Sequence, residues 1–151
     1  MNYVAVTPAL TRAPRALTNK ALAPEALHSD SLQLAVERLL RSAEGGPALA
    51  ARLERYLPFL RAEFEECSTR GGLYAEVLAT HPNLAPRVGR LKERQGSILE
   101  GLAALIEDLR RGSGARADAE AQRLSSRLRS LRRAEERLVI EADFRDLGGE
   151  G

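Results

Sequence analysis

The chain has 151 residues, enough for one ordinary domain with a single core. Hydrophobic residues make up 44% of it, but aromatic residues only 4% and tryptophan is absent, so we expect a core of aliphatic side chains packed between helices. The net charge of +2 is too small for the molecule as a whole to attract nucleic acid electrostatically.

The single cysteine, Cys67, excludes an internal disulfide and fits a reducing compartment such as the bacterial cytoplasm. No apolar run approaches the roughly 20 residues of a membrane span. Residues 3–10 (YVAVTPAL) are too short, and too soon interrupted by Pro8, for a signal peptide. We therefore predict a cytoplasmic protein that has no membrane partner.

Residues 1–28 contain three prolines and the basic residues Arg12, Arg15 and Lys20, with no acid before Glu25. This composition predicts an extended or flexible N-terminal arm. Two interpretations stay open. The arm is a tail without function, or it lies on its own domain or on a partner.

Four amphipathic helices are predicted after the arm. The first begins within residues 29–31, where any side chain can cap it, and stops at Gly45-Gly46. The second begins at Pro47, and its 4-3 spacing of apolar residues continues across Gly71-Gly72 to Leu78. The spacing thus predicts that this helix resumes on the same face after the two glycines.

A turn at residues 81–83 (HPN) separates the second helix from the third, with His81 outside the core and Asn83 as the cap. Residues 112–116 (GSGAR) form the next link. The third helix repeats its core positions at Leu84, Val88, Leu91, Gln95, Ile98, Leu102, Leu105 and Leu109. The fourth does so at Ala117, Ala121, Leu124, Leu128, Leu131, Glu135, Leu138 and Ala142.

Four such helices with short links predict an all-α fold, an up-down-up-down four-helix bundle. The predicted bundle domain spans residues 29–146, with residues 1–28 as the arm and residues 147–151 as a C-terminal tail.

Several core positions carry residues that do not suit a plain apolar core. They are Cys67 and Gly71 in the second helix, Gln95 in the third and Glu135 in the fourth. Each lies near the middle of its helix, so we expect them at a similar level of the bundle. Helical bundles build metal sites from inward-facing side chains in this way.

Segments of the sequence resemble the hemerythrin-like (HHE cation-binding) family. They are residues 59–67 (FLRAEFEEC) with 71–74 (GGLY), 83–88 (NLAPRV) with 91–95 (LKERQ), and 141–142 (EA) with 146–149 (DLGG). The resemblance covers about residues 30–149. It implies a four-helix bundle that holds a non-heme di-iron centre on histidine and carboxylate ligands.

Carried over to this chain, the resemblance leaves most ligand positions without a ligand. Cys67 stands where a histidine is expected, Gly71 where a glutamate is expected, and Gln95 and Leu131 where histidines are expected. Only Glu135 keeps a ligand-type group. The first-helix counterpart stays open between His28, Asp30 and Ser31. The resemblance therefore implies a degenerate member with vestigial metal positions at Cys67, Gly71, Gln95, Leu131 and Glu135.

The roles of the three polar residues stay open at this stage. Cys67 is either a redox sensor or ligand, or a small buried hydrophobe. Gln95 and Glu135 either bond to each other and fix the helix register, or Glu135 lies at the edge of the core. A buried Glu135 is expected to contact Gln95, an arginine or water, or else to have a raised pKa, because an unpaired buried carboxylate is costly.

The fourth helix carries an arginine-rich face of five residues with no acid between them: Arg123, Arg127, Arg129, Arg132 and Arg133. We favour a solvated face paired with acids such as Glu54, Glu65, Glu66 and Glu93. Its functional use would be docking of an acidic protein partner or of a second copy. Nucleic acid is the weaker alternative, because no aromatic residues are interleaved with the arginines.

The sequence therefore predicts a non-catalytic interaction, scaffold or regulatory module without a cofactor. No nucleophile-base pair, phosphate-binding glycine loop or Cys/His cluster indicates an enzyme. One alternative is residual binding or sensing of a metal or dioxygen species, with non-heme iron held by Glu135, Cys67 and groups of the first helix. The other is association with nucleic acid through the arginine-rich face.

Overall fold

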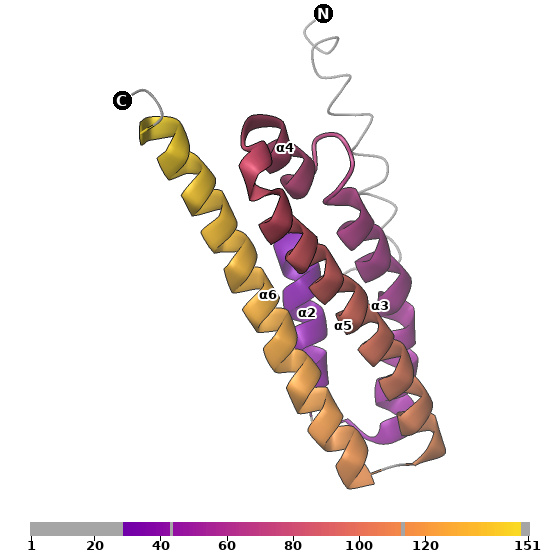
Figure 1. Cartoon of the computed structure of the whole chain (residues 1–151). Coiled ribbons are helices and arrows are strands. Elements are labelled where there is room, and N and C mark those ends of the chain that lie inside the picture. Colours follow the sequence, from indigo (N-terminus) through magenta and orange to yellow (C-terminus); the bar gives the residue numbers. More distant parts are fainter. Residues whose placement is uncertain (1–28, 43, 113, 149–151) are drawn as a thin grey trace, which may run out of the picture.

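The computed structural model describes residues 29–42, 44–112 and 114–148, and their regular structure is entirely helical (Figure 1). The elements in chain order are α2 (Ser29–Leu40), α3 (Gly46–Glu66), α4 (Leu73–Thr80), the 3-10 helix η1 (Pro82–Leu84), α5 (Ala85–Arg111) and α6 (Gly114–Gly148). The predicted all-α class is therefore confirmed. None of the described helices combines the length and the apolar character needed to cross a membrane.

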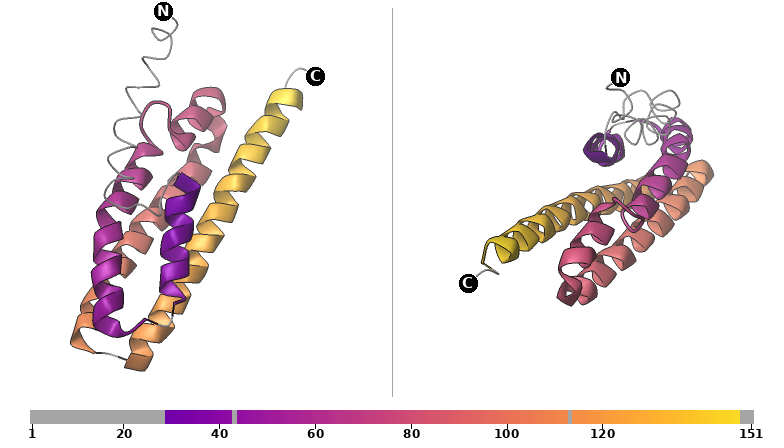
Figure 2. Two further views of the ribbon diagram at one scale, coloured as in Figure 1. Left: turned by 180° about the vertical axis from the view of Figure 1, so that it is seen from behind. Right: turned by 90° about the horizontal axis from the view of Figure 1, so that it is seen from above.

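The long helices enclose the core by pairwise packing. α3 lies against α5, α5 against α6, and α6 against α2, while α2 makes a smaller contact with α3. Successive long helices run in opposite directions, and α6 extends past the N-terminal end of α2 (Figures 1 and 2). This arrangement follows from four amphipathic helices that can bury their apolar faces only against each other.

The predicted 4-3 spacing is confirmed in the third and fourth helices of the sequence analysis, which are α5 and α6. All eight positions expected in each of them are buried. The spacing returns to the same side of a helix every seven residues, so it selects one buried face for the whole length of each helix. Gln95 and Glu135 are buried together with their aliphatic neighbours.

Helix ends follow the predicted proline and glycine signals at the starts of α3 and α5 and at the end of α5, but α2 ends at Leu40, five residues before the predicted stop at Gly45-Gly46. Pro47 and Pro86 lie in the first turns of α3 and α5, and Gly112 ends α5 with a positive φ of 79°. Asn83 does not cap α5, because it lies inside η1 and Leu84 takes the cap position. The link after α5 is also shorter than expected, since α6 already begins at Gly114.

The prediction that the second helix keeps its buried face across the glycines is wrong. α3 ends at Glu66, and Gly71 lies exposed in the turn before α4, with a φ of 84°. A Cβ on Gly72 would come within 1.9 Å of the Glu66 carbonyl oxygen, so only glycine allows the chain to turn this closely. The turn makes α4 a separate helix.

Three further expectations concern the turn at residue 81 and the two ends of the chain. His81 lies in a turn as predicted, but it is buried rather than outside the core. α6 continues to Gly148, past the expected end of the domain at residue 146. The predicted N-terminal arm, with Arg12, Arg15, Lys20 and His28, and residues 149–151 of the predicted tail lie outside the described residues.

Candidate functional site

Three of the five positions that the sequence analysis predicts to be vestigial metal positions meet in the core between α3, α5 and α6. Cys67 caps the C-terminal end of α3, Gln95 lies in the middle of α5, and Glu135 lies on the inner face of α6. The amide nitrogen of Gln95 donates to the Sγ of Cys67 at 3.6 Å and to Glu135 Oε2 at 3.4 Å. The predicted contact between Gln95 and Glu135 is therefore present.

A fourth residue, Tyr74, completes this buried polar cluster. Its hydroxyl group donates to Glu135 Oε2 at 2.5 Å, and its side chain is fully buried. The α3–α4 turn places it there, because the backbone N–H groups of Tyr74 and Ala75 both donate to the Cys67 carbonyl oxygen. We call Cys67, Tyr74, Gln95 and Glu135 the core polar cluster.

Burial and the negative charge of Glu135 set the acid-base behaviour of the cluster. Burial, followed by Glu135, raises the pKa of the Cys67 thiol from an ordinary value of 9.0 to about 11, against a smaller lowering by the Gln95 hydrogen bond. Burial, and then Glu135, also raise the pKa of Tyr74 far above its usual range. At neutral pH the thiol and the phenol are therefore both protonated, and the thiol is a poor nucleophile.

The remaining two predicted positions, Leu131 and Gly71, do not join the cluster. Leu131 is fully buried one turn before Glu135 and offers only an apolar side chain. Gly71 is exposed in the α3–α4 turn and lies on no buried helix face. The ligand position assigned to Gly71 on a continuous second helix therefore does not exist in this fold, because α3 has already ended.

The donor set of the core polar cluster does not fit the di-iron centre that the family resemblance implies. Such a centre uses imidazole and carboxylate ligands, whereas the cluster supplies one carboxylate, one amide, one thiol and one phenol. Within the described ranges no group of three or more His, Cys, Asp or Glu side chains is placed to hold a metal ion.

A second buried carboxylate, Glu37 of α2, meets arginines of α6. Its side chain is 2% exposed. Arg129 Nε donates to Oε1 at 3.2 Å and Arg132 Nη1 to Oε2 at 3.0 Å, while Arg41 Nη2 approaches Oε1 at 3.6 Å. The hydroxyl group of Ser125 donates to the backbone carbonyl oxygen of Glu37 at 3.3 Å. We call Glu37, Arg41, Arg129 and Arg132 the arginine cluster.

The arginine cluster changes the interpretation of the arginine-rich face. Arg129 and Arg132 join α6 to α2 and are part of the fold. Arg123 pairs with Glu120 on its own helix, and Arg127 donates to the Ser97 hydroxyl group on α5. These four arginines contact Glu37, Glu120 and Ser97 rather than the expected acids Glu54, Glu65, Glu66 and Glu93. Glu54 pairs instead with Arg110 of α5. Arg133 is exposed.

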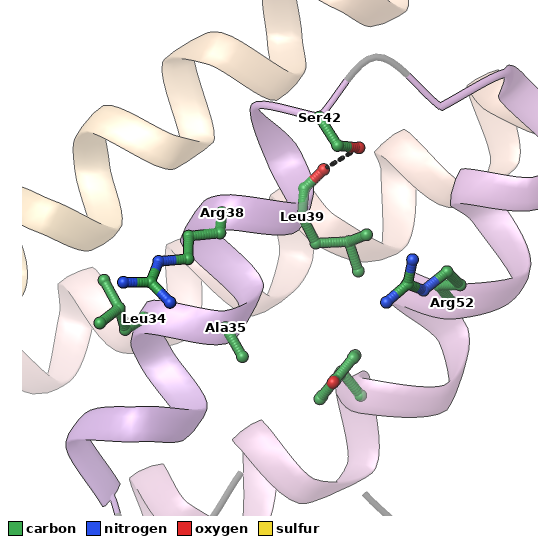
Figure 3. Close-up of a pocket in the computed structure, with 7 residues that line it drawn as sticks. Leu34, Ala35, Arg38, Leu39, Ser42 and Arg52 are labelled. Carbon is green, nitrogen blue, oxygen red and sulfur yellow. Dashed lines mark hydrogen bonds between the residues drawn. The ribbon is translucent and has the colours of Figure 1, made fainter. Parts of the chain in front are cut away.

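A shallow groove of about 350 Å³ lies between α2 and α3 (Figure 3). Its lining is apolar at Leu34, Ala35, Leu39 and Tyr56, with arginines from both helices. In Figure 3 the Arg38 guanidinium group lies over Leu34, and that of Arg52 points toward Leu39. Arg52 also pairs with Glu44 at 2.9 Å, so part of its charge is neutralised within the chain.

Tyr74 and Glu37 are the two functional candidates that sequence reasoning missed. Tyr74 reads as one more large residue in the apolar spacing, and its hydroxyl group gives no sequence signal for a partner 61 residues away. Glu37 did leave a signal. It directly follows buried Val36 and precedes buried Leu40 by three residues, so it lies at the edge of the apolar stripe of α2.

Comparisons of the chain with protein-family models, with curated proteins and with solved structures gave no match.

Proposed function

We propose that this protein is a non-catalytic four-helix bundle of the hemerythrin-like type, in which a metal site has been replaced by a structural hydrogen-bond cluster. In this proposal α2, α3, α5 and α6 are the four helices of the bundle. Its role is that of an interaction, scaffold or regulatory module. The observation that carries the proposal is the core polar cluster, where three vestigial ligand positions meet and bond to each other and to Tyr74.

The chemistry of the cluster supports a structural role. Glu135 is 9% exposed and receives a hydrogen bond from a phenol, which stabilises a buried carboxylate. The thiol stays protonated because its pKa is raised to about 11. Satisfied polar groups in a core fix one packing arrangement, because any other arrangement would leave buried groups without partners.

Iron analysis tests the proposed loss of the metal site. Full-length protein produced in iron-supplemented medium is analysed for metal content, and its absorption spectrum is recorded. We expect no stoichiometric iron and no absorption band from an iron centre. About two irons per chain, reduced in a Glu135→Gln variant but retained in the exposed-site control Glu93→Gln, would contradict the proposal and support the alternative of a metal-binding or dioxygen-binding protein.

The interaction role is proposed for the exposed arginines of α6. Arg129 and Arg132 pair with Glu37, whereas Arg123 and Arg133 remain at the surface. We therefore expect an acidic protein partner for these exposed arginines. The test is affinity capture from the source cells at low and high salt. An Arg123→Glu/Arg133→Glu variant should lose a partner that wild type and an Arg70→Glu control both retain. Equal recovery by all three proteins would remove this face from the proposal.

A further inference from the structure

Two arginines cross the seam between α5 and α6, which lie side by side and run in opposite directions (Figure 1). Arg94 Nη2 of α5 donates to Ser130 Oγ of α6 at 2.8 Å, and Arg127 Nη2 of α6 donates to Ser97 Oγ of α5. The two contacts are three residues apart on each helix, so they are separated by about 4.5 Å along the helix axes. We call Arg94, Ser97, Arg127 and Ser130 the seam cluster.

Within the described ranges, the two guanidinium groups of the seam cluster contact hydroxyl groups and form no ion pair. Arg87 of α5, by contrast, pairs with Glu141 of α6 near one end of the same seam. The acid next to Arg94 in the sequence, Glu93, is exposed and lies about 100° around α5 from it. A hydroxyl group accepts a hydrogen bond without carrying a charge. The positive charges of Arg94 and Arg127 therefore lie within about one helical turn of each other, and neither contacts an acid.

Two further arginines extend the positive charge along the seam. Arg90 lies one turn before Arg94 on α5, and Arg137 lies two turns after Ser130 on α6, so each is on the same side of its helix as that residue. Because the helices are antiparallel, both positions lie beyond the same end of the seam cluster. Both are exposed, as is Glu136, the acid next to Arg137. Four arginines from two helices therefore follow the seam.

The donors of the seam cluster suit a phosphate group better than a carboxylate. A guanidinium group presents a planar fork of N–H donors that matches two phosphate oxygens. A serine hydroxyl group that accepts a hydrogen bond still has its own proton to donate. The cluster thus offers two forks and two O–H donors to one anion, whereas a carboxylate has two oxygens and one charge. A phosphate monoester carries about 1.5 to 2 negative charges at pH 7 and three terminal oxygens, which complement two cations.

We propose that the seam cluster binds a phosphate dianion, either free phosphate or the terminal group of a phosphate monoester. Arg94 and Arg127 hold its oxygens from the two sides of the seam, and the two serine hydroxyl groups donate to it. Arg90 and Arg137 add electrostatic attraction at one end. This site does not depend on the proposed loss of a metal site or on the acidic protein partner proposed for other arginines of α6, so it stands or fails separately.

Isothermal titration calorimetry of the full-length protein at low salt tests the proposal. The probes are inorganic phosphate, O-phosphoserine, acetate and a short DNA duplex. We expect one phosphate site per chain and at least tenfold weaker binding of acetate. Binding of phosphoserine as well identifies the monoester as a ligand, whereas binding of phosphate without phosphoserine identifies the free ion. The absence of saturable phosphate binding would overturn the proposal, as would binding of acetate equal to that of phosphate. Binding of the duplex alone would overturn it in favour of nucleic acid.

A matched pair of double variants separates the seam cluster from the net charge of the protein. Arg94→Gln/Arg127→Gln should weaken phosphate binding at least tenfold with an unchanged circular dichroism spectrum. The control Arg61→Gln/Arg70→Gln removes the same charge from exposed positions of α3 and the α3–α4 turn and should bind as wild type does. Equal weakening in both variants would contradict the proposal. If the first variant does not fold, Arg94→Lys/Arg127→Lys keeps the charges and loses both forks, and unchanged phosphate binding by that variant would contradict the proposal.

Discussion

Two buried glutamates join α6 to the rest of the molecule, and the chain stabilises their charges in different ways. Glu37 is surrounded by arginines whose side chains are 24% to 40% exposed. Glu135 lies among the phenol of Tyr74, the amide of Gln95 and the thiol of Cys67. The first environment neutralises the charge with cations that reach water, whereas the second provides hydrogen bonds from a phenol and an amide inside the core.

The difference follows from which helices lie next to each carboxylate and not from depth, since Glu37 is 2% exposed and Glu135 is 9% exposed. Long arginine side chains can hold Glu37 at the α2–α6 contact and keep part of the guanidinium group hydrated. At Glu135 the phenol of Tyr74 and the amide of Gln95 donate hydrogen bonds from inside the core. These donors tie α4 and α5 to α6, and the contact of Gln95 with Cys67 adds the end of α3. The two glutamates should therefore respond differently to mutation and to salt.

The largest effect is expected at the arginine cluster. Arg129→Ala/Arg132→Ala leaves Glu37 buried with only the more distant Arg41, so we expect a loss of about 3 kcal/mol in the free energy of unfolding. Urea denaturation followed by circular dichroism measures it. The control Arg123→Ala breaks an exposed pair within one helix and should cost less than about 1 kcal/mol. Equal losses in both variants would show that Glu37 does not need its arginines.

A smaller loss is expected at the core polar cluster. Tyr74→Phe removes the phenol that donates to Glu135 and should destabilise the fold by about 2 kcal/mol. Adding Glu135→Leu should recover part of this loss, because the carboxylate that has lost the phenol as a donor is then no longer present in the core. High salt should weaken the contribution of the arginine cluster and leave that of Tyr74 nearly unchanged. A strong salt dependence of the Tyr74→Phe effect would remove the distinction between the two sites.

The third prediction concerns reactivity rather than stability. With its pKa raised to about 11, Cys67 should react with a thiol reagent at pH 8 roughly a hundredfold more slowly than an unperturbed thiol. Glu135→Gln removes a negative charge, which lowers the pKa of Cys67 and should accelerate the reaction. Glu93→Gln, at an exposed position of α5, is the control. A faster reaction in the control alone would show that Glu135 does not influence the thiol.

The same shift of the Cys67 pKa predicts a dependence of stability on pH. The pKa is higher in the folded protein than in the unfolded chain, so the folded state holds its proton more tightly at high pH. This contribution to stability is fully present below pH 9 and is lost as the pH rises through about 11. A Cys67→Ala variant should therefore show a smaller decrease in stability over this range than wild type.

The helices and their buried faces could be predicted from the sequence because their signals are local. The 4-3 spacing identified every expected core position of α5 and α6. Proline and glycine marked the starts of α3 and α5 and the end of α5. The presence of polar residues at Cys67, Gln95 and Glu135 in the apolar pattern also pointed to a shared level in the core, which the hydrogen bonds confirm.

Only the tertiary structure decided which side chains meet. The tight turn at Gly72 ends the buried face that the spacing predicted to continue, and it places Tyr74 beside Glu135. The packing of α2 against α6 turned two arginines of an expected docking face into partners of Glu37. Periodicity predicts which face of a helix is buried. The partner of a buried charge depends on which helices become neighbours and on which of their residues lie at the same level along the helix axes. These contacts join residues far apart in the chain, so no local pattern could specify them.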